Sequence, residues 1–232
     1  MKSKPDLFRL QIEYADRTRR MAGSDLYSWF NAANLFAIQQ RQRAVLLTLK
    51  RLGYLNLPDL RILEVGCGSG GVLTEFLGFG ASPQNLYGLD LLSDRLAEAK
   101  QRLIGTNFLQ ADGSEIPFPE RSFDLVLQCT AISSILDQDL RRLICSEMLR
   151  VVKPNGLILS YDFWLNPTNK QTRGLRMSEI RSAFPGCHIS YHRITLAPPI
   201  TRKLAPISWG LCLLLEGLKI FNTHYIVAIQ PR

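Results

Sequence analysis

Several marks of familiar protein classes are missing from this sequence of 232 residues. The five cysteines are odd in number and none of them forms a CxxC pair, which argues against a disulfide framework and against a zinc ribbon. The three histidines cannot complete a metal cluster with a nearby cysteine pair, so we expect no metal site.

Long apolar runs are missing as well. The N-terminal segment has no apolar stretch of the kind that a secretory signal contains. The most apolar run near the C-terminus, Ile207 to Leu215, is too short to span a bilayer core of roughly 30 Å. Together with the unpaired cysteines, these absences predict a cytoplasmic protein in a reducing compartment.

Positive charge is present in excess, but it is unevenly distributed. Residues 1–57 hold 10 basic and 4 acidic side chains, residues 58–165 hold 9 and 14, and residues 166–232 hold 9 and 2. A basic balance usually suggests nucleic acid or an anionic surface as partner. Here an acidic middle lies between two basic flanks, so one uniform basic surface is not expected.

Periodicity divides the chain in the same places. Apolar residues recur at helical spacing between Leu35 and Leu52, and Gly53 is suited to end that helix. From residue 61 short apolar runs alternate with helical segments, which predicts βαβ units and a parallel sheet. The predicted strands are 61–65, 85–90, 108–111, 122–129, 157–163, 188–196 and 224–229, and the predicted helices are 72–79, 93–103 with Ser93 as N-cap, 137–152, 178–184 and 204–218.

The expected fold is therefore α/β: a doubly wound, Rossmann-like, seven-stranded and mostly parallel sheet with an N-terminal helical lid. Residues 1–57 would form the lid and residues 58–165 the ligand-binding core. Residues 166–232 would complete the same domain with an insert on the substrate side and the last strands.

A glycine-rich loop, Gly66-Cys67-Gly68-Ser69-Gly70-Gly71, follows the first predicted strand. It fits both G-x-G-x-G and G-x-G-x-x-G, and both need a tight turn under a helix N-terminus with a ligand close to the backbone. Glycines alone do not decide which ligand this is.

Acidic residues at three successive strand ends favour one answer. Glu64 precedes the glycine loop, where its charge would repel a pyrophosphate but attract an ammonium or sulfonium group. Asp90 ends the second strand, where it can accept hydrogen bonds from ribose hydroxyls, and Asp112 follows the third strand, where it can accept from an adenine amine. This arrangement indicates a cationic nucleoside as ligand.

The segments ILEVGCGSG, LYGLD, LQADGSEIPFPERSFDLVL and LRVVKPNGLILSYD, between residues 61 and 162, together resemble class I S-adenosylmethionine-dependent methyltransferases. They most resemble the branch that includes quinone-biosynthetic and related small-molecule enzymes. The resemblance implies S-adenosylmethionine as cofactor and a floor of Gly66, Gly68 and Gly70 beneath its methionine part. Glu64 would hold the amino end, and Gln128 would lie nearby.

For the nucleoside, the resemblance implies Asp90 at the ribose hydroxyls, with Leu91 and Leu92 against the adenine. Asp112 would bond the adenine amine, with Gly113 beside it. Cys67 lies inside the glycine loop, where small residues are required in any case.

No dedicated general base is evident. Methyl transfer is an in-line displacement in which the protein mainly positions and desolvates the acceptor, and a base is needed only for a protonated, weakly acidic acceptor. Asp162, Tyr161 and His192 are candidates by their location alone. Asp162 could equally cap a turn, and His192 could be structural or solvated on a strand face.

The acceptor should bind outside the carboxyl ends of the strands, covered by the N-terminal helices and by the insert after the fifth strand. Aromatic and polar residues are dense in both segments, although they could simply seal the lid. The candidates are Tyr14, Arg17, Tyr27, Phe30, Trp164 and Arg173.

The predicted function is methyl transfer, most simply to oxygen, on a small-molecule acceptor such as a natural product, glycan or lipid-like compound, with an acidic or lipid-linked acceptor favoured by the basic flanks. The alternatives are an RNA or protein methyltransferase and a non-catalytic cofactor-binding protein. Nucleic acid is not expected, because no RNA-binding module is evident. The basic and apolar stretch from Pro198 to Leu215 could contact a membrane or pack on the sheet, and the oligomeric state stays open.

Overall fold

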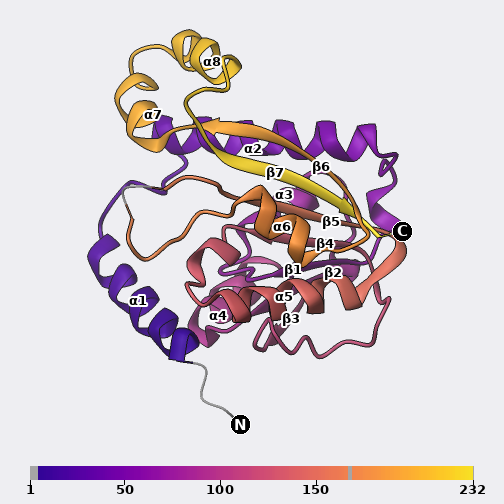
Figure 1. The fold of residues 1–232 in the computed structure, drawn as a ribbon. Coiled ribbons are helices and arrows are strands. Elements are labelled where there is room, and N and C mark those ends of the chain that lie inside the picture. The colour runs from indigo at the N-terminus through magenta and orange to yellow at the C-terminus, as the bar shows by residue number, and fades with distance from the viewer. Residues whose placement is uncertain (1–4, 167–168, 232) are drawn as a thin grey trace.

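A computed structural model describes residues 5–166 and 169–231, and within them one sheet forms the centre of the molecule (Figure 1). The strand order is β3-β2-β1-β4-β5-β7-β6, with β7 antiparallel to both of its neighbours and the pairs from β3 to β5 parallel. The predicted fold class is confirmed. The strands are β1 Ile62–Val65, β2 Leu86–Asp90, β3 Asn107–Gln110, β4 Phe123–Cys129, β5 Val152–Phe163, β6 His188–Leu196 and β7 Asn222–Gln230.

Helices cover both faces of this sheet. The α-helices are α1 Pro5–Met21, α2 Ala32–Arg51, α3 Gly71–Gly78, α4 Ser93–Arg102, α5 Gln138–Val151, α6 Met177–Ala183, α7 Pro198–Leu204 and α8 Trp209–Gly217, and short 3-10 turns span Leu57–Asp59, Pro83–Asn85 and Ile132–Ser134. One core cluster joins α5 and α6 to one face of the strands, and a second joins α2, α3 and α4 to the other. Neighbouring residues of β1 follow this division: Ile62 belongs to the second cluster and Leu63 to the first.

Two predictions about helix ends were wrong, one next to a proline and one at an N-cap. The helix predicted over 204–218 begins only at Trp209, because Pro206 has no backbone N–H to donate and the chain turns there between the end of α7 and the start of α8. Ser93 is the first residue of α4, and the N-cap is Leu92, which makes no side-chain capping bond.

The fifth strand is also longer than predicted. It begins at Val152, which pairs with Phe123, and the register then shifts before Leu157 pairs with Leu125. Residues 153–156 were predicted to be a stop between helix and strand, and they form the irregular part of this strand.

Segments from the two ends of the sequence lie side by side. The start of α2 packs on α7 and α8 in a third apolar cluster, where the rings of Phe36 and Trp209 meet edge to face at 5.3 Å. Arg43 of α2 also donates to Glu216 of α8 at 3.2 Å. Across the described residues, we find no helix that is both long and apolar enough to cross a membrane.

His224 of β7 is buried in this sheet. Its ring stacks on Tyr161 with centroids 4.7 Å apart and lies 3.9 Å from the centroid of Phe163. Burial lowers the pKa of His224 to about 3, and the positive charge of Arg41 acts in the same direction. The folded protein therefore holds this ring neutral.

This burial predicts an acid-sensitive stability. The pKa of His224 is about 3 when folded, and a histidine in an unfolded chain titrates near 6.5, so the unfolded state binds the extra proton between these values. The free energy of unfolding should fall as pH drops from about 6.5 toward 4, and this fall should be shallower for His224→Phe. Denaturant titrations across that range measure it. His188→Gln, at an exposed position, should keep the wild-type slope, and an unchanged slope in His224→Phe would contradict the prediction.

Candidate functional site

The order of the strands reverses between β1 and β4, and a cavity of about 500 Å³ lies at the carboxyl ends of these strands. Such a reversal is where open α/β sheets bind ligands. The lining combines the glycine loop, the ends of β2 and β4, and helix α1. It includes Leu10, Tyr14, Arg17, Tyr27, Arg41, Glu64, Gly66, Cys67, Gly68, Asp90, Leu91, Leu92, Arg95, Asp112, Gly113, Gln128, Cys129, Thr130 and Ser134.

The glycine loop is shaped by backbone geometry that side chains would disturb. Gly66 has φ +75°, and a Cβ there would lie 2.6 Å from the Cβ of Ala131, so only glycine lets the loop approach the end of β4. Gly70, predicted to lie under the ligand, is not among the cavity residues. A Cβ on Gly70 would lie 2.6 Å from Leu103, so its role in the structure is close packing against the end of α4.

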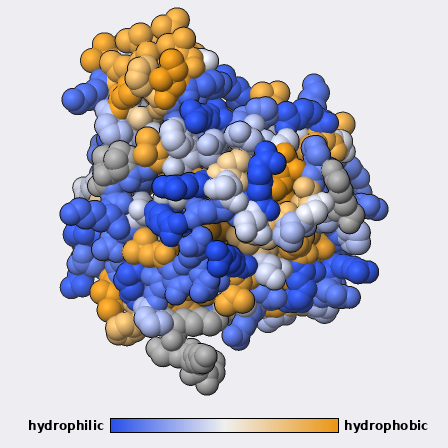
Figure 2. All heavy atoms as spheres, viewed as in Figure 1, coloured by the Kyte–Doolittle hydropathy of each residue, from blue (hydrophilic) through white to orange (hydrophobic). Residues whose placement is uncertain are grey.

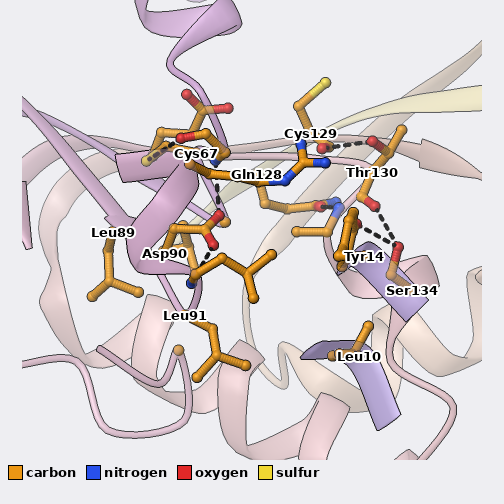
Figure 3. A pocket seen from close by; sticks show the side chains of 18 of the residues that line it. Leu10, Tyr14, Cys67, Leu89, Asp90, Leu91, Gln128, Cys129, Thr130 and Ser134 are labelled. Atoms are coloured by element: carbon orange, nitrogen blue, oxygen red, sulfur yellow. Dashed lines mark hydrogen bonds between the residues drawn. The ribbon is translucent and has the colours of Figure 1, made fainter. Parts of the chain in front are cut away.

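The carboxylates of Asp90 and Asp112 are fixed by neighbouring backbone groups. Asp90 accepts from the N–H of Gly68 at 2.8 Å and from the N–H of Leu92 at 2.9 Å (Figure 3). Burial raises the pKa of Asp90, against the lowering effect of these N–H groups and of Arg95. Asp112 accepts from both the N–H and the hydroxyl of Ser114 at 2.9 Å. Both carboxylates border the cavity, where the sequence predicts contacts to a nucleoside.

A buried cluster of charges lies at the other end of the cavity. Arg41 of α2 forms an ion pair with Glu75 of α3. The side chain of Glu64 is buried close enough to both for their charges to act on its pKa. Burial opposes the charge of Arg41, but Cys129, Glu75 and Tyr161 around it raise its pKa. Burial raises the pKa of Glu64 well above its usual value, although the charge of Arg41 works against this.

This cluster leaves two hydrogen-bonding atoms unpaired within the described residues. Oε2 of Glu64 and Nε of Arg41 are buried and have no partner there. Unpaired buried polar atoms cost free energy, so such atoms at a cavity indicate groups that a ligand satisfies. One atom is an acceptor and the other a donor, which fits a ligand that carries both an ammonium and a carboxylate.

Helix α1 closes the opening of the cavity. Asp6 accepts from the N–H groups of Leu136 and Asp137 at 2.6 and 2.9 Å, which ties the start of α1 to the loop after β4. Farther along the helix, the hydroxyl of Tyr14 lies 3.3 Å from that of Ser134, and Figure 3 shows this pair across the cavity from Asp90. The predicted lid is thus attached to the sheet through polar contacts.

The three candidate bases lie outside the cavity lining. Asp162 is buried and accepts from the N–H groups of Ser133 and Phe163, so it supports the loop after β4. The hydroxyl of Tyr161 is buried against Thr195 at 2.9 Å. His192 lies on β6 and contacts Arg51, away from the glycine loop. None of the three borders the cavity, and a role as base stays a prediction for each of them.

The acceptor-side candidates divide into two groups. Tyr14, Arg17 and Tyr27 line the cavity, and Arg17 donates to the hydroxyl of Tyr27. The other three lie elsewhere for three different reasons. The side chain of Phe30 is fully exposed, Trp164 donates to the backbone of Asn222 at 2.8 Å, and Arg173 pairs with Glu179.

The cofactor candidates other than Gly70 all line the cavity, and their contacts to a ligand remain predictions. The side chain of Gln128 is occupied by the protein, since its Oε1 accepts from the N–H of Ala131 at 3.1 Å, and its predicted backbone contact to the methionine end stays a prediction. Cys129 also borders the cavity, and burial raises the pKa of this thiol to about 12, so it stays protonated.

Arg41 and Arg95 are cavity residues that the sequence reasoning missed. Arg41 lies in a polar stretch between the apolar residues of the predicted helix, and no role was assigned to it. Its spacing from Val45 and Thr48, which are both buried, places it on the stripe that faces the sheet, and this was the available signal. Arg95 lies 4.9 Å from the centre of the Tyr14 ring, a contact that sequence spacing cannot reveal.

Comparison with known proteins agrees with this geometry. A family described as "Methyltransferase domain" matches residues 62–156. The fatty-acid O-methyltransferase of Mycolicibacterium smegmatis is 36% identical over 104 residues, which cover 44% of this chain and 36% of that protein. Phthiotriol/phenolphthiotriol dimycocerosates methyltransferase 1 of Mycobacterium ulcerans is 34% identical over 119 residues, or 50% of this chain and 42% of that protein. The chain thus spans about two fifths of these relatives.

A solved structure extends the likeness of the fold to nearly the whole chain. The magnesium protoporphyrin IX methyltransferase of Synechocystis PCC 6803, solved with bound S-adenosylmethionine, has a TM-score of 0.65 and 16% identity and covers 99% of both chains. The fold is thus shared over nearly the whole chain, and residues 62–156 match a methyltransferase domain. S-adenosylmethionine, which is bound in the Synechocystis structure, is the cofactor that this match supports.

The residues present fit this cofactor. The cavity offers an acceptor and a donor, on Glu64 and Arg41, for the two charged groups of a methionine. It also offers the carboxylate of Asp90 beside the apolar side chain of Leu91 for a ribose and its base. Over the described part of the chain, no group of three or more His, Cys, Asp or Glu side chains could hold a metal ion.

The buried arginine gives the second testable prediction. If Arg41 receives the methionine carboxylate, Arg41→Gln should weaken S-adenosylhomocysteine binding by about 10- to 100-fold, the usual range for a lost charged hydrogen bond. Binding of methylthioadenosine, which has no carboxylate, should change by less than about 3-fold. Calorimetry with both ligands checks this. Arg43→Gln, two residues farther along α2, is the control and should bind both ligands like wild type. An equal loss for both ligands would show that Arg41 is merely structural.

Proposed function

We propose that the protein transfers a methyl group from S-adenosylmethionine to an oxygen of a lipid-like acid, most simply its carboxylate. The observation that carries this proposal is the composition of the cavity. It has apolar walls beyond the glycine loop and an arginine at its opening, and no histidine occurs among its described lining residues. The names of two mycobacterial relatives, a fatty-acid and a phthiotriol methyltransferase, support a lipid-like acceptor, and the first of them names an acid.

The proposal divides the work between parts of one domain. The acidic middle, residues 58–165, would hold the cofactor, with Glu64 at the methionine end, where Arg41 of the N-terminal flank joins it. Asp90 would accept from the ribose hydroxyls and Asp112 from the adenine amine. The flanks would build the acceptor side. Of the basic residues in those flanks, Arg17 and Arg41 line the cavity, whereas Arg173 and Arg176 lie beside Glu179.

A carboxylate acceptor explains how the site can work without a base. S-adenosylmethionine supplies the methyl group and its own leaving group, so the protein has to bring a nucleophile into line and exclude water. A carboxylate is ionised at neutral pH and has no proton to lose. The carboxylates of Glu64 and Asp90 would be occupied by the cofactor, and the thiol of Cys129 stays protonated, so the proposal assigns the removal of an acceptor proton to none of them.

The apolar part of the lining would hold the hydrocarbon portion of such an acid. This lining includes Leu7, Leu10 and Met21 of α1, together with Ile135 and Ile144. Arg17 lies between this apolar lining and Tyr27 and would pair with the acceptor carboxylate. A charge-assisted contact of this kind would orient the oxygen toward the glycine loop.

The proposed reaction can be tested directly with the purified chain. Octanoate, palmitate and a long-chain alcohol are each incubated with isotopically labelled S-adenosylmethionine, and methyl esters or ethers are detected by mass spectrometry. We expect methyl esters of the acids. The rate at saturating acid should stay level between pH 6.5 and 8.5, because the nucleophile is already ionised. Labelled ethers without esters, or no product from any acid, would overturn the proposal.

The third prediction concerns Arg17. Arg17→Gln should raise KM for the acid by about 10-fold, the magnitude of a charged hydrogen bond of about 1.5 kcal/mol, and leave the affinity for S-adenosylhomocysteine unchanged. Steady-state kinetics and calorimetry measure the two effects. Arg176→Gln removes a charge from the other basic flank outside the cavity and should leave KM unaltered. If both substitutions raised KM equally, the basic flanks would act only through their general positive charge, and Arg17 would not contact the acceptor.

A further inference from the structure

Helices α7 and α8 and the turns beside them form an apolar projection, which we call the α7–α8 tip and define as residues 198–221. In Figure 2 it is the hydrophobic knob at the top of the molecule, above a largely hydrophilic surface. Ile207 is 81% exposed, Leu214 63% and Ile220 70%. Exposed apolar patches of this kind mark surfaces that a partner covers.

Helix α8 has no polar face. Its sequence is WGLCLLLEG, and its leucines at 211, 213 and 214 are exposed while Cys212 is buried against α2 and α7. The one charged residue, Glu216, is 4% exposed and is paired with Arg43 and Lys219. A helix that is apolar all round normally lies in a protein core or in lipid. Here one side faces the protein and the other side is uncovered.

The charge around the tip is positive. Glu216 is the single acidic residue between 198 and 221, and its pairing neutralises it. Arg202 and Lys203 lie exposed in the last turn of α7 without an acidic residue beside them in sequence. Apolar side chains next to exposed basic groups complement the surface of an anionic bilayer, whose charge attracts such groups while the apolar residues insert.

A short segment of chain links the lining of the cavity to the tip. The start of α2 packs on α7 and α8 through Ala33 and Phe36. The segment just before it carries Trp29 and Phe30, which are 58% and 100% exposed. Tyr27, in the same segment, lines the cavity. One continuous stretch of chain therefore runs from the cavity to the tip, with exposed aromatic residues on the way.

We propose that the α7–α8 tip docks on anionic lipid bilayers and places the opening of the cavity toward the lipid surface, from which a lipid-like acid can enter. The second half of this statement rests on the proposed function, and the docking itself does not. A second copy of the chain is the other partner that an apolar surface suggests. The convex shape of the tip and its flanking positive charge favour insertion into lipid over a flat contact between two like-charged copies.

Vesicle binding tests the docking without cofactor or acceptor. The full chain is floated with vesicles of pure phosphatidylcholine and with vesicles that contain 30% phosphatidylglycerol. Binding to the anionic vesicles should be at least about 10-fold stronger and should weaken as salt rises. Substitution of Arg202 and Lys203 by Gln should remove most of this preference, because each charge near such a surface contributes about 5-fold.

A matched pair of triple variants separates the tip from general hydrophobicity. Ile207→Ser, Leu214→Ser and Ile220→Ser together should lower vesicle binding by about 100-fold. The control variant changes three comparably exposed apolar residues elsewhere and should bind like wild type: Leu47→Ser, Leu55→Ser and Ile104→Ser. Circular dichroism and cofactor affinity verify that both variants are folded.

The outcomes are distinct. Absence of binding to anionic vesicles, equal losses in both triple variants, or a stable dimer in solution that the tip substitutions dissociate would each overturn the docking. An activity assay then tests the second half. The tip variant should methylate soluble octanoate like wild type and should be slower on palmitate presented in vesicles. If no acid is methylated but vesicles still bind the tip, the proposed function fails and the docking stands.

Discussion

The site depends on a charged arginine held in the interior. Burying a guanidinium costs several kcal/mol unless neighbouring charges and hydrogen bonds offset it. Arg41 meets this requirement through Glu75 of α3, and it lies close to Glu64 at the end of β1. Helix α2 is thereby fixed over the glycine loop, and α2 in turn supports α7 and α8. The ion pair thus adds a buried polar contact to the apolar packing that holds α2 between the glycine loop and the tip.

The acidic character of the middle segment has several causes, and the ligand site is one of them. Glu64, Asp90 and Asp112 border the cavity. Other carboxylates serve the fold: Asp137 caps α5 by accepting from two N–H groups, and Asp124 pairs with Lys153 at 2.7 Å. The charge partition of the sequence therefore reflects helix capping and ion pairs together with ligand chemistry. It marks the segment without identifying each residue's role.

The sequence predicted what depends on neighbouring residues along the chain. Strand periodicity, the glycine loop and the acids at strand ends are local, and the structure brings them to one edge of the sheet as expected. Contacts between distant segments were not predictable in this way. The burial of Arg41 depends on α3, the role of Asp162 depends on the loop that contains Ser133, and Trp164 turns to the backbone of Asn222. Pro206 shows a different error. This proline is a local signal for a helix break, but the prediction followed the apolar spacing around it and continued the helix through it.

The position of β7 has a consequence for the order of folding. This strand, residues 222–230, lies between β5 and β6 and bonds to both. Until a ribosome has made it, β5 presents an open edge and β6 has no neighbour in the sheet. Open strand edges invite pairing with other chains, so the nascent protein is exposed to misassembly until β7 has been made. The sheet is therefore completed only when the last of its described strands in chain order pairs with both of its neighbours.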